Sequence, residues 1–256
     1  MLTGVAAQHH DGQTFVTWQA MPGTGWIYRV YVKNSPFTAS SQLDTTVRVA
    51  CVGDSTSLDR RISVLLGTPC AFRIDSAAAP LLLTRGLFVN TPTTYDARWY
   101  AVTADSGAGE CAVLEPGLNT LSTAVYETPN RIRPVWQRTL TTPVRGEDYV
   151  LWAPTRDTPF TTALASVPGL AYHFGVQRGA PGGALMVSGH GRGGNFFNSL
   201  FGSGTAGETV MSVDDWTAYP DQASWYQGFS TRYDPTVAYN PIPGSGTVAP
   251  YTERRT

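Results

Sequence analysis

The chain has few charged residues, no excess of either charge and no long apolar run. Charged residues make up 14% of its 256 positions, and the formal net charge is −1. This balance gives no electrostatic footprint for nucleic acid or for an anionic membrane surface. No apolar run approaches the roughly 20 residues that a helix needs to cross a bilayer, and the first residues lack the basic and apolar regions of a signal peptide. We therefore expect neither nucleic acid nor a membrane as a partner.

Cysteine is also scarce, and its spacing excludes the common metal and redox motifs. The three cysteines are Cys51, Cys70 and Cys111, and no two of them form a Cys-x-x-Cys pair. One disulfide with one free thiol is the simplest arrangement in an oxidising compartment, and three thiols the simplest in a reducing one. The pair Cys51–Cys70 is the best candidate for a disulfide, because a covalent link would help a loop-rich insertion between strands.

The most informative stretch is residues 183–195, where an apolar run leads into a turn with four glycines around His190. The run Leu185–Val187 predicts a buried strand, and the glycines let backbone N–H groups approach a ligand closely. No Gly-Lys-Ser/Thr follows, as a phosphate loop requires, and no acidic residue lies suitably about 20 positions on, as a dinucleotide site requires. We expect no cofactor here. The alternative is a tight turn in which the glycines serve backbone geometry alone.

The neighbours of this loop favour a functional interpretation. Strand patterns occur at Tyr172–Val176 and Glu208–Trp216, and a short helix is expected over Asn195–Phe201. Strand, glycine loop, helix and strand together resemble the His-Gly loop that follows the third strand of α/β-hydrolases. In that family the loop contributes an N–H to the oxyanion hole. The resemblance implies that the oxyanion-hole loop, and hence the catalytic contribution of the chain, is His190, Gly191, Arg192 and Gly193.

The order of motifs extends the resemblance over nearly the whole chain. It is similar to bacterial secreted esterase-like proteins in five segments: His190–Asn195, Asp214–Trp216, Trp225–Phe229, Tyr233–Pro235 and Thr252–Arg255. Such a hydrolase needs a nucleophile on a Gly-x-Ser-x-Gly elbow, followed by an acid and a histidine. The chain has no such elbow, and no histidine follows His190. The resemblance thus implies the amino-terminal part of a longer secreted or periplasmic hydrolase, inactive by itself.

The first half of the chain has the period-two pattern of β-strands. The pattern occurs at Thr14–Trp18, Trp26–Val32 and Trp99–Ala104, and a last strand is expected at Cys111–Leu114. Over residues 3–126 the motifs resemble a fibronectin type III sandwich. Two departures are the long segment 38–92 and Arg98, which stands where a corner tyrosine is expected.

The predicted fold class is a fibronectin type III-like β-sandwich followed by the N-terminal part of an α/β-hydrolase-like sheet. The prolines of segment 129–134 favour an extended connection, so we place the sandwich at 1–128 and the α/β part at 129–256. Strand-like runs at Pro134–Arg138 and Asp148–Trp152 precede the glycine loop and agree with antiparallel opening strands.

A dense aromatic segment lies between the last predicted strand and the terminus. It either covers the sheet edge or forms the wall of a cleft for an ester or carbohydrate-linked substrate. The candidate cleft residues are Asp215, Trp216, Trp225, Tyr226 and Tyr233.

Two further polar motifs carry weaker expectations. Asp214 and Asp215 are adjacent and cannot act together on a strand, so a turn or cap role is expected. His9-His10-Asp11 is expected to begin a solvated loop. The alternative function is a non-catalytic module that binds a carbohydrate or a protein, or serves as a spacer.

Overall fold

The computed structural model describes residues 1–165, 168–190, 194–200 and 207–214, together with the backbone of four two-residue strands farther along. In this part of the chain β-structure dominates, with three sheets of three to five strands and two α-helices. The chain divides into two compact units, which we describe separately. The first unit contains Met1–Phe72, Pro80–Ile132 and Asp157–Thr161. The second unit contains Arg73–Ala79, Arg133–Arg156 and Thr162–Thr256.

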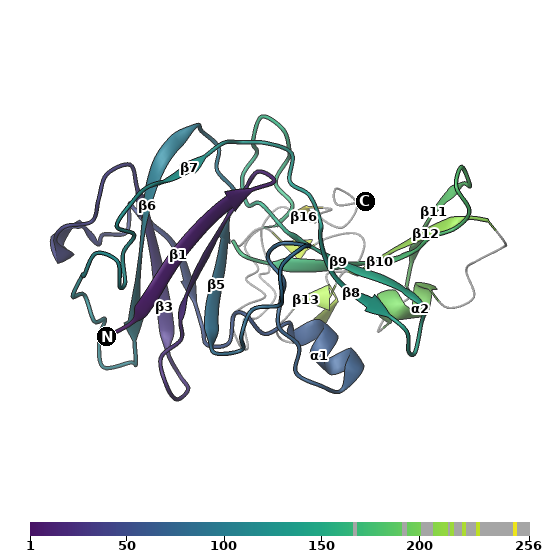
Figure 1. Ribbon diagram of the computed structural model, residues 1–256, viewed down its shortest axis with the longest axis horizontal. Helices are drawn as coiled ribbons and strands as arrows, with labels where there is room; N and C mark the ends of the chain where they lie inside the picture. Colours follow the sequence, from purple (N-terminus) through teal and green to yellow (C-terminus); the bar gives the residue numbers. More distant parts are fainter. Residues whose placement is uncertain are drawn as a thin grey trace. The chain divides into compact units, whose positions relative to one another are not determined.

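The first unit is built from two antiparallel sheets, whose strands are labelled in Figure 1. Its strands are β1 (Thr3–His10), β2 (Gln13–Gln19), β3 (Ile27–Lys33), β4 (Arg48–Val52), β5 (Arg85–Asn90), β6 (Asp96–Asp105) and β7 (Val125–Glu127). One sheet has the order β1-β2-β5 and the other the order β4-β3-β6-β7. A 3-10 turn (Ser40–Gln42) and helix α1 (Arg60–Leu66) lie between strands.

Alternate side chains of both sheets meet in one core, so the first unit is a β-sandwich. Val16 and Trp18 of β2 belong to the same buried cluster as Tyr28 of β3 and Val102 of β6. The Trp18 and Tyr28 ring centroids are 5.3 Å apart. Gly86 lies opposite Trp18 in β5, and a Cβ there would lie only 2.0 Å from the indole. The period-two pattern thus predicted β2, β3 and β6 correctly.

A buried carboxylate joins the edge strand β7 to its neighbours. Glu127 is buried, and its Oε1 accepts hydrogen bonds from the hydroxyl of Thr14 at 2.7 Å and from that of Tyr100. Burial, and then the nearby Glu127 charge, raises the pKa of the Tyr100 hydroxyl well above its usual value. The Asn90 amide of β5 donates to the same oxygen at 3.4 Å, so side chains from four strands meet at one buried carboxylate.

Two expectations for the first half are wrong. Helix α1 interrupts what was predicted to be all β, and Cys111–Leu114 is not a strand. The carboxylate of Asp105 accepts from the backbone N–H groups of Gly107 and Gly109 at 2.8 and 3.1 Å, which turns the chain. Only an isolated bridge between Asp105 and Glu110 forms at this end of β6, and β7 pairs with its other end.

The cysteines and the first two histidines also differ from expectation. Cys51, Cys70 and Cys111 are all free thiols, so the candidate disulfide is not formed. His9 and His10 end strand β1 instead of beginning a loop. Nδ1 of His9 lies 2.9 Å from the Thr14 hydroxyl, and Nε2 accepts from the Thr128 N–H at 3.1 Å. The His9 ring therefore connects the end of β1 to the start of β2 and to the residue that follows β7.

The second unit contains a five-stranded sheet of order β11-β12-β10-β9-β8. Its elements are β8 (Val135–Leu140), β9 (Gly146–Trp152), β10 (Ala171–Gln177), β11 (Leu185–Gly189), α2 (Phe196–Leu200) and β12 (Thr209–Val213). The pairs β8–β9, β9–β10 and β10–β12 are antiparallel, whereas β11 and β12 are parallel and are connected through α2. The predicted strands and short helix of this region are therefore present, and α2 packs against β10 and β12 (Figure 1). The prediction that Leu185–Val187 is buried is wrong, because Leu185 is 63% exposed and Val187 is 50% exposed in β11.

A segment from far back in the sequence lies along strand β8, at the edge of this sheet. Gln137 of β8 accepts from the backbone N–H of Arg73 at 2.8 Å and donates to the Arg73 carbonyl oxygen at 3.0 Å. The N–H of Trp136 donates to the Ser76 hydroxyl at 3.0 Å, and the Arg73 guanidinium lies 5.0 Å from the Trp136 ring centroid. Segment Arg73–Ala79 thus satisfies edge groups of β8 that would otherwise invite another strand.

Four short strands follow the sheet in two antiparallel pairs. They are β13 (Trp216–Thr217) with β14 (Gln222–Ala223), and β15 (Phe229–Ser230) with β16 (Val248–Ala249). Among the described residues, no helix is long and apolar enough to span a bilayer.

Candidate functional site

One face of the five-stranded sheet carries a row of ionisable side chains, one from each strand or its end. In a sheet, side chains of paired residues, or of residues offset by two, lie on the same face. Arg138 is paired with Asp148, and Asp148 is offset by two from the partner of His173. The registers of β12 with β10 and with β11 extend to place Asp214 beside both His173 and His190. The row is therefore Arg138, Asp148, His173, Asp214 and His190.

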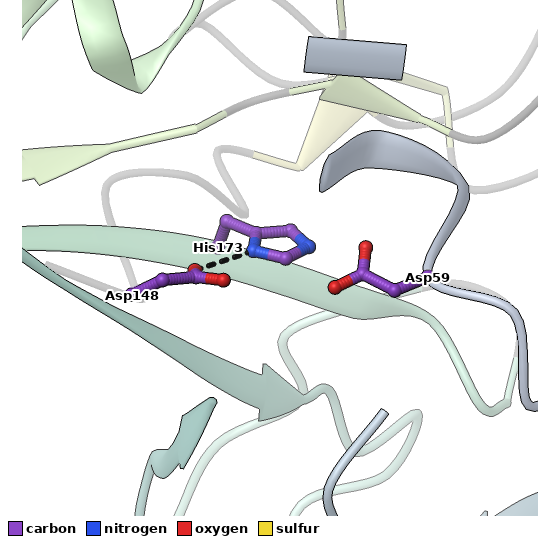
Figure 2. Close-up of side chains that lie close together, drawn as sticks. All are labelled: Asp59, Asp148 and His173. Atoms are coloured by element: carbon purple, nitrogen blue, oxygen red, sulfur yellow. Dashed lines mark hydrogen bonds and ion pairs between the residues drawn. The ribbon is translucent and has the colours of Figure 1, made fainter. Parts of the chain in front are cut away.

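The β8–β10 end of the row is a buried triad. Asp148 is 0% exposed, and its two carboxylate oxygens lie 2.7 Å from Nδ1 of His173 and 3.2 Å from Nε of Arg138. Figure 2 shows the bond between Asp148 and His173 as a dashed line. A buried carboxylate is tolerated when cationic or polar partners satisfy both of its oxygens. Because both oxygens are engaged, this end of the row is held firmly.

The other end of the row pairs Asp214 with His190. Nε2 of His190 lies 3.6 Å from Oδ1 of Asp214, and both side chains are almost fully buried. The backbone N–H of Asp214 donates to the carbonyl oxygen of His173 at 3.0 Å. Asp214 was expected in a turn or cap role. Its carboxylate also faces the histidine that begins the glycine loop, a contact that the turn or cap prediction did not include.

Helix α2 covers this face and brings no charged side chain to it. The Phe196 ring stacks on the His173 ring, with centroids 5.6 Å apart and planes 9° apart. Gly175 makes room for the helix, since a Cβ there would lie 2.5 Å from Leu200 and 2.7 Å from Phe196. The Asn195 side chain accepts from the Phe197 N–H at 2.9 Å and caps the helix. The glycine loop thus runs between two fixed points, His190 and Asn195.

The predicted site residues are only partly within the described part of the chain. His190 is described and buried. Gly191, Arg192 and Gly193 lie outside the described residues. The same holds for the cleft candidates Asp215, Trp225, Tyr226 and Tyr233, and for Trp216 only the backbone in β13 is described.

Sequence reasoning missed Arg138, Asp148 and His173 as members of one polar row. A signal was present, because Asp148 alternates with Val150 and Trp152 on a strand whose same-face positions are otherwise apolar. A charged residue at such a position is buried and needs a partner. The sequence did not indicate which partner it has.

The triad by itself is not a metal site. Asp148 and His173 are residues of metal-binding type, but they supply two donors, whereas a zinc site takes three or four protein ligands. One Asp148 oxygen is also engaged by Arg138. Asp59, also drawn in Figure 2, belongs to the first unit, where its carboxylate caps α1 by accepting from the Ile62 N–H at 3.1 Å.

No protein-family model, no curated protein and no solved structure matches the chain significantly. The geometry of the row and the motifs of the sequence therefore carry the functional argument.

Proposed function

We propose that the chain supplies the oxyanion-hole side of a secreted or periplasmic serine ester hydrolase with an α/β-hydrolase-like fold. The observation that carries the proposal is the placement of His190. It is buried at the end of β11, directly before the glycine loop, and the parallel partner β12 follows through α2. This is the strand–loop–helix–strand setting in which such a loop presents an N–H to a developing oxyanion.

The sheet topology supports the proposal from a second direction. The strands that precede the loop pair in antiparallel fashion, and the first parallel pair is β11 with β12. Antiparallel opening strands before a parallel core are what the resemblance to α/β-hydrolases implies. In the same proposal the sandwich of the first unit is fibronectin type III-like, because its sheets hold three and four antiparallel strands around one core.

The chemistry assigned to this chain is stabilisation of negative charge. In ester hydrolysis the carbonyl oxygen becomes an oxyanion in the tetrahedral intermediate, and preorganised backbone N–H groups stabilise it. Loss of one such donor costs about 10²–10³ in turnover. The sequence holds no Gly-x-Ser-x-Gly elbow, so the nucleophile and general base have to come from outside residues 1–256.

Serine-hydrolase labelling of two proteins tests this proposal. The first is residues 1–256, and the second is the complete product of the natural reading frame that encodes them. A fluorophosphonate probe is expected to label only a longer product, which also hydrolyses a p-nitrophenyl ester. Labelling of residues 1–256 would contradict the missing nucleophile. A complete product that neither reacts with the probe nor hydrolyses the ester would refute the hydrolase proposal.

One observation favours a carbohydrate-binding module as the second candidate. Tyr126 of β7 is 76% exposed and Tyr95 is 68% exposed. Tyr126 pairs with Ala97, two positions after Tyr95, so both rings lie on one side of the sheet edge. Exposed tyrosines present a flat apolar face with a polar tip to a sugar ring. Binding of a soluble polysaccharide that Tyr126→Ala abolishes, without any hydrolase labelling, would favour this candidate.

A further inference from the structure

We infer that Asp214 is a positioning residue, which holds the imidazole of His190 and thereby fixes the end of β11 from which the glycine loop starts. The inference deepens the proposed function and rests on it for its catalytic consequence. Its structural part stands on the contacts of Asp214 alone, and these can be measured whether or not the protein hydrolyses esters.

Asp214 is held from two sides. Its backbone N–H donates to the His173 carbonyl oxygen at 3.0 Å, which ties it to β10 one residue after β12 has ended. Its carboxylate lies 3.6 Å from His190, which follows the last residue of β11. One residue therefore connects the ends of three strands. A displacement of the Asp214 carboxylate would therefore directly affect the position of the His190 imidazole.

The carboxylate is suited to this task because it is buried and lies 3.6 Å from the ring nitrogen of a buried imidazole. An electrostatic contact in a buried setting is stronger than the same contact in water. Among the described residues, the other ionisable groups on this face are His173, Asp148 and Arg138, and they form their own triad. Helix α2, which packs on the same face, contributes none. Asp214 is thus the carboxylate assigned to His190, and Asp148 the one assigned to His173.

The two aspartates give a matched pair of variants. Asp214→Asn removes the charge beside His190, and Asp148→Asn removes an equally buried charge from the same sheet face. Both are expected to lower the stability of the second unit. Only Asp214→Asn is expected to change the ring nitrogen and carbon resonances of His190. It is also expected to speed amide exchange in the peptide that begins at His190 by about fivefold or more, a typical size for coupling between linked groups. Asp214→Glu, which keeps the charge, is expected to restore part of the protection.

Ester-hydrolysis kinetics of the complete gene product, without the probe, supply the second readout. Displacement of a catalytic group by about 1 Å costs about 10²-fold in rate, so Asp214→Asn is expected to lower kcat by up to that factor. KM is expected to change little, because the oxyanion contact forms in the transition state and not with the bound ester. Gly53→Ala, a change in the first unit with nothing within 4 Å of the added Cβ, is expected to leave kcat and KM unchanged.

The outcomes separate the two proposals. Unchanged His190 resonances and exchange in Asp214→Asn would overturn the positioning role. Equal effects of Asp148→Asn on His190 would also overturn it, because the role would then be general stability. The gene product could fail to hydrolyse esters while Asp214→Asn still changes the His190 resonances and amide exchange. That result would leave the positioning role intact and refute only the hydrolase proposal.

Discussion

Replacing Gly175 with alanine tests how tightly α2 is fitted over the polar row. The added Cβ would lie 2.5 Å from a Leu200 methyl and 2.7 Å from the Phe196 ring, well inside normal contact distance. Leu200 is also buried, and its Cγ lies 3.2 Å from the added Cβ, so turning the methyl does not remove the clash completely. Phe196 is fully buried and stacked on His173, so it cannot move without losing that contact. Overpacking costs about 1–3 kcal/mol, and we expect about 2 kcal/mol of unfolding free energy to be lost.

Urea unfolding followed by hydrogen exchange measures this loss and locates it. The midpoint is expected to fall, and amides of α2 and β10 are expected to lose protection first. Gly53→Ala is the matched control, since nothing lies within 4 Å of its Cβ position, and its effect should stay within about 0.5 kcal/mol. In a Leu200→Ala background the cost of Gly175→Ala should shrink, because part of the clash is gone. An unchanged midpoint in Gly175→Ala would show that α2 is not packed as described.

Three further predictions concern the sandwich. Gly86→Ala should cost about 3 kcal/mol, at the upper end for overpacking, because the added methyl meets the buried Trp18 indole at 2.0 Å; a thermal melt measures it. Glu127→Ala should cost about 3 kcal/mol in urea unfolding, since it removes the acceptor to which the buried Thr14 and Tyr100 hydroxyls donate, and Glu127→Gln should cost less because its amide oxygen still accepts. Burial, and then a hydrogen bond to a neighbouring carboxylate, raises the pKa of Tyr31 to about 12. The unfolded chain therefore releases this proton first, so stability should fall between about pH 10 and 12, and Tyr31→Phe should reduce that slope.

Each of these predictions has an outcome that contradicts it. A Gly86→Ala protein that melts with the native one would mean that the indole of Trp18 can move aside. Equal losses for Glu127→Ala and Glu127→Gln would show that the carboxylate charge, and not its acceptor role, matters. A Tyr31→Phe protein with the native pH dependence would assign the alkaline slope to other buried tyrosines, such as Tyr28 and Tyr149, whose pKa values burial also raises.

Strand patterning in the sequence located β2, β3 and β6 of the first unit and all five strands of the second unit's main sheet, but it missed β1, β4, β5 and β7. It did not find α1, a seven-residue helix without a long apolar stripe. The signals that specify this helix are local, namely the capping carboxylate of Asp59 and the left-handed Gly67 that ends it. Such short elements depend on caps more than on periodicity.

The polar row was harder to predict, because alternation shows which residues of a strand share a face but not which strands are neighbours. In chain order β11 follows β10, and the natural expectation is that they pair. In the structure β12 lies between them. This strand order brings Asp214 beside both His173 and His190. No local sequence pattern connects these three residues. The glycine loop itself was visible in the sequence because its composition is unusual.

The contact between segment Arg73–Ala79 and strand β8 also has a consequence for folding during synthesis on the ribosome. The two partners Arg73 and Gln137 are 64 positions apart, with most of the first unit's later strands between them. At a synthesis rate of 5–20 residues per second, the segment waits about 3–13 s after leaving the ribosome before its partner strand has been made. During that time it must stay available for pairing while the strands on either side of it form the sandwich. A gene divided between Ile132 and Arg133 would encode the segment and β8 on separate chains. Neither chain would then contain both sides of the contact that covers the β8 edge.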